Sequence, residues 1–466
     1  MKPEGIEPVN ECAEDTALGG NSRQPLPVPA TWPSESTQHG MAAVRFPVAD
    51  PRKELARDFT VGELPIPNRL CVHPMEGCDA DKHGNPTELT LRRYRRFASG
   101  GAGLIWAEAC AVDASGRGNP HQILINDRTA DGLRKIVETV QTKGVGSGGE
   151  AQRPAIIVQL SHAGRYRKPE GKPEPAIVHH SAVLDQPLGL SVDAPLLSDG
   201  ELEAIGERYV QAASVAASCG FDGVDIKACH GYLLHELLYA HRRERSRYGG
   251  SFDCRTRLLR EIISEVRRTC PNLAVAVRLS VYDGIPYPWG WGTDLRGSPA
   301  LEEPAALIRA LAQEGVELVS VAVGNPYYNP HLERPYDRPI RGGYEPTETP
   351  LESVLRMLEL TAEIHRRVPE MPLVATGLSW LRHLVPTVAA GMVAEGWVSS
   401  VGLGRMAIAH PGFANDILAG GQVAHQKQCI ACSACIQLMR DGGRSGCVVR
   451  DAEIYAEEYR RVRRSA

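Results

Sequence analysis

The most distinctive chemical feature of the sequence is a group of four cysteines near its C-terminal end. They follow the spacing Cys429-x₂-Cys432-x₂-Cys435-x₁₁-Cys447. Three thiolates close together and a fourth farther along the chain suit a [4Fe–4S] cluster, in which each iron atom needs one ligand. Structural zinc, the alternative, usually binds two separated Cys-x-x-Cys pairs. A disulfide framework is disfavoured because the sequence shows no secretory signal.

Polar residues that could bind a cofactor follow several short β-branched runs. Gly377, Gly404 and Arg405 suit a phosphate group, which backbone N–H groups and a guanidinium bind well. Gln159 and Arg278 suit a polar heteroaromatic ring, and the two sites together describe flavin mononucleotide (FMN). Each residue alone also has a structural explanation. Arg278 could form an ion pair within the fold, Gly377 could end a helix, and Gly404 with Arg405 could form a solvated turn.

These residues must be positioned by a fold in which strands and helices alternate. The candidate strands are Leu70–His73, Leu104–Trp106, Ala155–Leu160, Gly223–Lys227, Leu273–Leu279, Leu318–Val323, Leu373–Ala375 and Val398–Leu403. The helical segments between them are Leu89–Ser99, Asp131–Thr142, Leu202–Cys219, Thr256–Arg268, Ala305–Glu314, Leu351–Arg367 and Trp380–Ala390. Such alternation forms parallel βαβ units, and eight units predict a closed (β/α)₈ TIM barrel of the α/β class. No Gly-x-Gly-x-x-Gly follows a strand, which counts against a Rossmann domain.

Composition and charge limit the classes of function. The chain has 466 residues, of which 42% are hydrophobic, and 52 Lys and Arg against 56 Asp and Glu give a net charge of −4. Near-neutral charge argues against nucleic acid as a partner. The sequence contains no run of about 18 apolar residues, so we predict no membrane span. We therefore expect a cytoplasmic protein that binds neither nucleic acid nor membrane.

The length is best explained by one enlarged barrel with an addition at each end. Residues 1–50 are rich in Pro, Gly and polar residues, which predicts a disordered or loosely packed leader; Met41 is an alternative start. Residues 51–425 form the predicted FMN-binding barrel. Residues 426–466 form a cysteine-bearing extension for the cluster.

The sequence resembles the old yellow enzyme-type NADH:flavin oxidoreductases, in the subgroup of 2,4-dienoyl-CoA reductase and trimethylamine dehydrogenase. The resemblance covers roughly residues 58–460 and rests on the motifs Asn68-Arg69, Pro74-Met75, Gly101–Ile105, Gln159–Arg165, His230–Leu233, Tyr248–Ser251 and Gly402–Arg405. It implies FMN on a (β/α)₈ barrel, with NAD(P)H or an external electron carrier as reductant. The implied flavin-binding positions are Pro74, Met75, Glu76, Gln159, Arg278, Gly377, Gly404 and Arg405.

The motif after the fourth strand is where this family binds its substrate and supplies a proton. The resemblance implies that Lys227 and His230 donate hydrogen bonds to a substrate carbonyl oxygen, while Tyr232 protonates the α-carbon. Lys227 departs from the family pattern, in which His is usual, and could anchor a carboxylate or a more anionic enolate. The structural alternative is that Lys227 pairs with Asp225, two residues earlier on the same strand face.

Glu76 stands where trimethylamine dehydrogenase has the cysteine that is joined covalently to its flavin. The resemblance therefore implies that FMN is bound non-covalently, unless Cys78 substitutes. It also implies that Glu76 lies near the edge of the flavin. The alternative is a solvated carboxylate in a loop.

Substrate contacts are expected from loops over the mouth of the barrel. The predicted contacts follow the third and the sixth strand, and they are His162, Arg165, Tyr328 and His331. A separate group of arginines on one helix predicts a solvated face, formed by Arg92, Arg93, Arg95 and Arg96.

The leading hypothesis is an FMN-dependent ene-reductase that reduces the C=C bond of an α,β-unsaturated carbonyl or an enoyl thioester, with the [4Fe–4S] cluster relaying electrons to FMN. Multidomain relatives carry a further FAD- and nucleotide-binding portion, whereas this sequence ends 19 residues after Cys447. We therefore expect electrons from NAD(P)H or from a separate electron-donor protein, and a homo-oligomer is compatible with this hypothesis. The alternatives are an amine or C–H dehydrogenase that works in the oxidative direction and an electron-transfer subunit of a larger complex.

Overall fold

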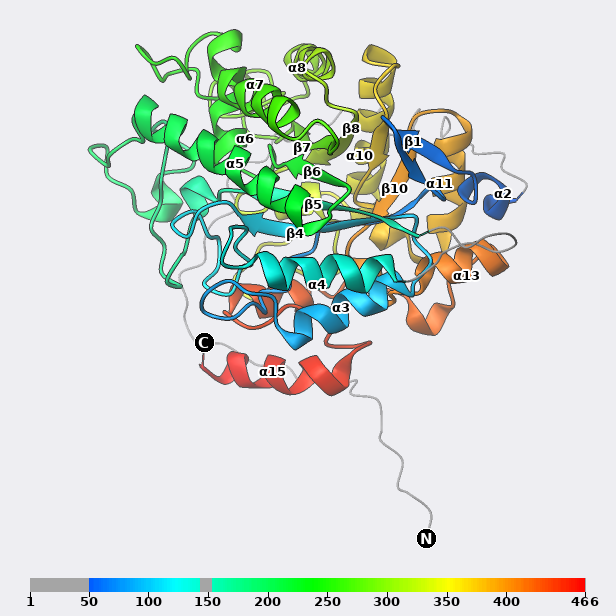
Figure 1. The fold of residues 1–466 in the computed structure, drawn as a ribbon. Coiled ribbons are helices and arrows are strands. Elements are labelled where there is room, and N and C mark those ends of the chain that lie inside the picture. Colours follow the sequence, from blue (N-terminus) through cyan, green and yellow to red (C-terminus); the bar gives the residue numbers. More distant parts are fainter. Residues whose placement is uncertain (1–49, 143–152, 466) are drawn as a thin grey trace.

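The computed structural model describes residues 50–142 and 153–465 (Figure 1), so nearly all of the expected leader lies outside the described residues. Eight parallel strands close into a barrel in the order β10-β3-β4-β5-β6-β7-β8-β9. Their bounds are β3 Leu70–Val72, β4 Leu104–Ala111, β5 Ala155–Ser161, β6 Gly223–Ile226, β7 Ala274–Tyr282, β8 Leu318–Val323, β9 Leu373–Ala375 and β10 Ser400–Leu403. The eight predicted strands and the (β/α)₈ barrel are confirmed.

The barrel strands are buried along their whole length, because one face points into the barrel and the other packs against helices. Neighbouring strands are parallel, and their register brings residues from distant parts of the sequence into contact. Gln159 of β5, for example, is the register partner of Asp225 of β6. The register therefore decides which polar side chains meet at the C-terminal ends of the strands.

The longer helices form the outer layer of the barrel, and shorter ones lie in the segments that follow the strands. Their bounds are α3 Glu88–Ala98, α4 Ala130–Gln141, α5 Asp199–Cys219, α6 Leu233–Leu238, α7 Phe252–Thr269, α8 Glu302–Gln313, α9 Pro330–Glu333, α10 Pro350–Arg367, α11 Val385–Ala394, α12 Arg405–Ala409 and α13 Phe413–Gly420. The helix predicted at Trp380–Ala390 is wrong in one respect, since the chain forms a 3₁₀ helix, η3 (Leu378–Leu384), before α11. Arg382 has φ +54 there, and Pro386 in the first turn of α11 favours a new helix start.

The N-terminal end of the barrel is filled by apolar side chains and closed by a hairpin. The chain enters through α2 (Pro51–Leu55), and β1 (Phe59–Val61) then pairs antiparallel with β2 (Leu64–Ile66). Val61 and Ile66 join the apolar cluster inside the barrel that contains Trp106. Full burial of one such side chain stabilises the fold by about 1.5–3 kcal/mol. The ligand cavity therefore lies at the opposite end.

The cysteine-bearing extension contains α14 (Ala434–Arg440) and α15 (Ala452–Ser465). Figure 1 shows α15 below α3 and α4, on the outside of the helix layer. Leu438, Tyr455 and Val462 form a small apolar cluster of the extension. Across the two described stretches of the chain, none of the helices has the length and hydropathy that crossing a membrane requires.

Candidate active site

The C-terminal ends of the barrel strands surround a cavity of about 270 Å³. Every residue predicted to bind FMN or to act in catalysis lines this cavity: Pro74, Met75, Glu76, Gln159, Lys227, His230, Tyr232, Arg278, Gly377, Gly404 and Arg405. These residues come from six different strands or from the loops that follow them. Enzymes with this fold build their active sites from the same end of the barrel.

The floor of the cavity is a polar network on adjacent strands. Asp225 accepts hydrogen bonds from Gln159 Nε2 at 2.5 Å and from Trp106 Nε1 at 2.8 Å. It also accepts one from the backbone N–H of Arg278 at 2.6 Å. Burial raises the pKa of Asp225 to about 6, against the opposing effect of these donors. Asp225 thus orients Gln159, and the alternative in which Lys227 pairs with Asp225 is not found, since Lys227 lies beside Glu76 instead.

One end of the cavity has the features of an anion site. Gly377 has φ +82, a conformation that favours glycine, and Gly404 precedes the short helix α12. The Arg405 side chain is buried, and its Nη1 has no hydrogen-bond partner among the described residues; the same is true of Nε of Arg278. Buried polar atoms normally have partners. These two guanidinium groups therefore fit a ligand with an anionic group and a polar ring, as FMN has.

Glu76, Lys227 and Tyr232 form a compact group on one wall. The Lys227 Nζ lies 3.8 Å from Oε1 of Glu76 and 3.8 Å from the centre of the Tyr232 ring. Burial raises the pKa of Glu76, and the positive charge of Lys227 partly opposes that shift. The Glu76 side chain is only 14% exposed, which contradicts the alternative that Glu76 is a solvated carboxylate in a loop. Glu76 instead holds the ammonium group over the ring, in a cation–π contact.

Tyr232 belongs to an aromatic wall that the structure makes visible. Its hydroxyl lies 3.5 Å from the hydroxyl of Tyr327, and the Tyr327 ring stacks on Tyr166 with centres 3.7 Å apart. Burial, together with the charge of Glu76, raises the pKa of Tyr232 well above its ordinary value. The phenol is therefore protonated at neutral pH and can act as a general acid.

His230 faces a carboxylate that sequence reasoning missed. Its Nε2 lies 3.3 Å from Oε1 of Glu333 in α9, although this contact lacks hydrogen-bond geometry. Burial lowers the pKa of His230 well below its ordinary value, so the ring is neutral. His230 has φ +66 and Gly231 φ +73, a tight turn at the cavity wall. The only sequence signal for Glu333 is its place in the loop after the sixth strand.

The structure does not bring His162 and Arg165 into the cavity lining. Arg165 is fully buried in ion pairs with Glu236 at 2.7 Å and Asp185 at 2.5 Å. His162 Nδ1 accepts a hydrogen bond from the backbone N–H of Gly164 at 3.1 Å, and burial lowers the pKa of His162 to about 4. The ion pairs of Arg165 are thus made within the protein, and the substrate contacts proposed for His162 and Arg165 stay predictions.

Tyr328 and His331 are also outside the cavity lining. Tyr328 packs against the hydrophobic core, and His331 Nδ1 lies 2.7 Å from the hydroxyl of Tyr344. The neighbouring Tyr327 lines the cavity instead. Consecutive residues of a turn point in different directions. The sequence alone therefore does not show which of Tyr327 and Tyr328 faces the cavity.

The cysteines predicted to bind a cluster line a second, smaller cavity: Cys429, Cys432, Cys435 and Cys447. Arg405 borders both cavities, so the two are adjacent. The backbone N–H of Ala431 donates to Cys429 Sγ at 3.4 Å, and that of Arg450 donates to Cys447 Sγ at 3.3 Å. Burial and the three neighbouring thiols raise the pKa of Cys435 to about 12. A positive group would be needed here to keep the thiols ionised.

No three or more His, Cys, Asp or Glu side chains within the described residues are arranged to hold a single metal ion. The four cysteines nevertheless surround one cavity. An iron–sulfur cube separates its ligands more widely than one ion does, because each thiolate binds a different iron atom. Four cysteines around one cavity match the number of ligands that a cluster takes.

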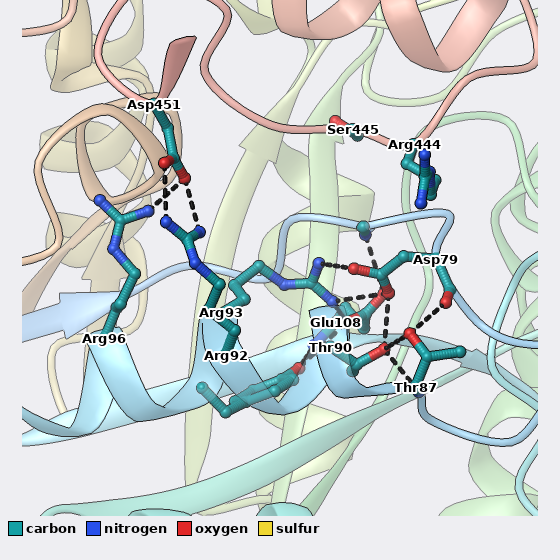
Figure 2. A network of polar contacts seen from close by, with 12 residues as sticks. Asp79, Thr87, Thr90, Arg92, Arg93, Arg96, Glu108, Arg444, Ser445 and Asp451 are labelled. Carbon is teal, nitrogen blue, oxygen red and sulfur yellow. Dashed lines mark hydrogen bonds and ion pairs between the residues drawn. The ribbon is translucent and has the colours of Figure 1, made fainter. Parts of the chain in front are cut away.

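A buried ionic network joins the extension to the loop that follows β3 (Figure 2). Arg93 of α3 forms ion pairs with Asp79, at 2.7 Å, and with Glu108. Glu108 accepts a hydrogen bond from the backbone N–H of Gly77 at 2.9 Å. The carbonyl of Gly77 accepts another from the backbone N–H of Ser445 in the extension at 2.6 Å. The loop next to Glu76 is therefore held from the barrel side and from the extension side.

The prediction that the arginines of α3 form a solvated face is wrong for most of them. Arg92 and Arg96 both pair with Asp451, next to the start of α15 (Figure 2), and Arg93 is buried. Arg95, paired with the exposed Glu88, is the one that remains half exposed. The α3 face is thus a docking surface for the extension, which a run of arginines alone does not reveal.

Comparisons with known proteins agree with the geometry. Residues 54–307 match the NADH:flavin oxidoreductase / NADH oxidase family. The chain is 26% identical over 383 residues to a metal reductase of Desulforamulus reducens, covering 81% of this chain and 50% of that protein. It is 33% identical over 235 residues to the NADPH dehydrogenase of Bacillus subtilis, covering 50% of this chain and 64% of that protein. The chain thus spans about half to two thirds of the length of these relatives.

Solved structures share the fold. The structure of 2-naphthoyl-CoA reductase superposes with a TM-score of 0.68 at 20% identity, covering 88% of this chain and 58% of that chain. Histamine dehydrogenase from Rhizobium sp. 4-9 gives 0.65 at 19% identity, covering 86% and 52%. The family match spans more than half of the sequence and includes the β3, β5, β6 and β7 ends of the cavity. The chain therefore belongs to the NADH:flavin oxidoreductase / NADH oxidase family of flavin-dependent oxidoreductases.

Proposed function

We propose that this chain is an FMN-dependent ene-reductase that reduces the C=C bond of an α,β-unsaturated carbonyl compound or an enoyl thioester. The observation that carries the proposal is that Lys227, His230 and Tyr232 line one cavity with Gln159 and Arg278. Two hydrogen-bond donors and one proton donor thus lie beside a floor that fits a flavin ring. Family membership supports NAD(P)H as the reductant.

The residues proposed to hold FMN occupy three sides of the cavity. Gln159 and Arg278 would contact the ring, while Gly377, Gly404 and Arg405 would hold the phosphate. Pro74, Met75 and Glu76 border the cavity from the loop after β3. Arg405 is well suited to this role because its buried Nη1 lacks a partner among the described residues.

The chain's own groups account for charge and proton transfer in the reduction. The hydride for the β-carbon of the substrate would come from reduced FMN held by the residues named above. Lys227 and His230 stabilise the negative charge that develops on the carbonyl oxygen, and a buried site strengthens such contacts. Tyr232, kept protonated by burial, gives its proton to the α-carbon.

The extension is proposed to carry a [4Fe–4S] cluster on Cys429, Cys432, Cys435 and Cys447. The common cavity and the two N–H···S hydrogen bonds support this assignment. A cluster would accept single electrons from an external donor protein. NAD(P)H needs no cluster, because it transfers a hydride directly to a flavin. Arg405 lines both cavities, so the two proposed cofactor sites are adjacent.

A second candidate function is the oxidation of an amine. Two carboxylates, Glu76 and Glu333, line the same cavity and could bind an ammonium group. Histamine dehydrogenase and an amine oxidase of Pseudomonas geniculata share the fold, with TM-scores of 0.65. Both carboxylates are already paired, however, Glu76 with Lys227 and Glu333 with Arg334. Reduction therefore remains the better-supported direction.

Anaerobic half-reactions test the direction. Protein reconstituted with FMN is reduced by NADH or NADPH, and the flavin absorbance is then followed after a cyclic enone is added. The proposal expects full reoxidation with one enone consumed per flavin. If only amines reduce the flavin and no enone reoxidises it, the enzyme works in the oxidative direction. If neither reaction occurs but an electron-carrier protein exchanges electrons with it, the chain is an electron-transfer subunit.

A further inference from the structure

The outer part of the active-site cavity carries positive charge that the proposed chemistry does not use. Lys168, on the loop after β5, and Arg440, at the end of α14, line the cavity together with the catalytic residues. Arg440 Nη2 donates to the carbonyl of Pro326 at 2.7 Å, and its guanidinium lies 5.8 Å from the centre of the Tyr327 ring. The barrel and the extension therefore each contribute one cation.

The other charges of the cavity are accounted for. Lys227 pairs with Glu76, and Arg334 pairs with Glu333. Arg278 and Arg405 have buried nitrogens that fit the flavin ring and phosphate. Lys168 differs, because no described carboxylate lies within ion-pairing distance of its ammonium group. Burial, and then the charge of Arg440, lower the pKa of Lys168, and both side chains line the same cavity.

Tyr327 contacts both Arg440 and the proposed proton donor Tyr232. Its hydroxyl lies 3.5 Å from that of Tyr232, and Arg440 lies over its ring. A ligand that reaches both places must therefore be long, with a reactive group beside Tyr232 and an anionic group beyond Tyr327. A phosphate or pyrophosphate offers several charged oxygens, so it can accept hydrogen bonds from the Lys168 ammonium and the Arg440 guanidinium at once.

We propose that Lys168 and Arg440 form a binding site for a phosphate-bearing group, here called the mouth site. This inference rests on the proposed function. The group would belong either to an enoyl thioester of coenzyme A or to NAD(P)H, because both carry a pyrophosphate. In either case the extension completes the binding site of the barrel through Arg440.

Direct binding to the FMN-loaded protein tests the mouth site without using activity. ADP and adenosine share a base and a sugar, so isothermal titration of the two measures the contribution of the pyrophosphate. We expect ADP to bind about tenfold more tightly, the size of one charge-assisted hydrogen bond. Lys168→Gln and Arg440→Gln should each remove most of this difference, whereas Arg440→Lys should keep much of it.

Lys172→Gln is the matched control, because Lys172 lies on the same loop, is exposed and does not line the cavity. Equal affinity of wild-type protein for ADP and adenosine would overturn the proposal. So would an equal loss of ADP affinity in Lys172→Gln and Lys168→Gln. Retained ADP selectivity without any enone reduction would leave the mouth site standing and would refute the ene-reductase proposal alone.

Steady-state kinetics then identify the source of the phosphate. A rise in KM for an enoyl-CoA in Lys168→Gln, with KM for NAD(P)H unchanged, assigns the mouth site to the substrate. The reverse pattern assigns it to NAD(P)H. The KM for a neutral cyclic enone should not change in Lys168→Gln or Arg440→Gln. A rise in that KM would contradict a site that binds an anionic group.

Discussion

The two cavities of this protein are built in different ways. The floor of the larger cavity is fixed by strand register, since Gln159 and Asp225 are direct partners across β5 and β6. The cysteine cavity has no strands; its chain turns through positive φ angles at Ala431 and Ser433. A small apolar cluster and a few polar contacts hold the extension, including the hydrogen bond from Ser445 to Gly77.

This difference separates two sources of order. The barrel floor is rigid because the close-packed apolar side chains around it would have to rearrange before it could move. The extension depends on ion pairs, on the arginines of α3 and, by our proposal, on a bound cluster. Changes in the barrel floor should therefore affect chemistry, whereas changes at the junction should affect stability and the cysteine site.

The largest expected effect is the loss of the proton donor in the barrel. Tyr232→Phe should lower the turnover of enone reduction by about 10²–10⁴-fold, the usual contribution of a general acid. The flavin and iron content should not change, because the substitution removes one oxygen from the cavity wall. Rapid-mixing measurement of flavin reoxidation checks this.

Tyr209→Phe is the control, since the Tyr209 hydroxyl is also buried but has no hydrogen-bond partner among the described residues. Its turnover should match that of the wild type. If Tyr232→Phe reoxidises at the wild-type rate, the proton comes from another group.

The next effect is on stability at the junction of the two regions. Arg93→Met leaves Asp79 and Glu108 buried without their cation, which should lower the free energy of unfolding by about 3–5 kcal/mol. Arg95→Met is the matched control, because it removes a half-exposed arginine of the same helix. It should lower the free energy of unfolding by at most about 1 kcal/mol. Urea unfolding of both variants measures the difference; equal losses would contradict a buried network.

The smallest expected effect is a difference between the barrel and the extension in how their stability depends on pH. Burial raises the pKa of Asp225 to about 6 and that of Glu108 to about 7, so these groups bind protons more tightly when folded. Their contribution to barrel stability should fall as the pH rises from about 4 to about 7. Burial also raises the pKa of Asp451, but Arg92 and Arg96 outweigh it and the net shift is downward.

Asp451 therefore stabilises the docked extension above its unfolded pKa, and this stabilisation is lost as the pH falls through its folded pKa. Acidification below about pH 3.8, the ordinary pKa of an aspartate, should loosen the extension, whereas the raised pKa values of Asp225 and Glu108 keep these barrel carboxyls protonated there. Hydrogen exchange resolved by peptide measures both regions at once. Faster exchange in the barrel strands than in α15 on acidification would contradict this assignment.

The sequence was informative wherever strand ends decide position. Eight strands could be located, and the polar residues that follow them meet in one cavity because parallel strands end at the same rim. It was uninformative for Glu333 and for Tyr327 versus Tyr328, because loop geometry decides which side chain faces inward. It also missed the role of Arg96, whose partner Asp451 lies 355 positions away and leaves no local pattern.

The central claim is that the two cavities hold two different cofactors, FMN in the barrel and a [4Fe–4S] cluster in the extension. Anaerobic purification followed by quantification of flavin, iron and sulfide tests it directly. We expect about one FMN and about four irons and four sulfides per chain, with Cys435→Ser keeping its flavin and losing its iron. Zinc in place of iron, or a chain that binds no FMN, would refute the two-cofactor assignment.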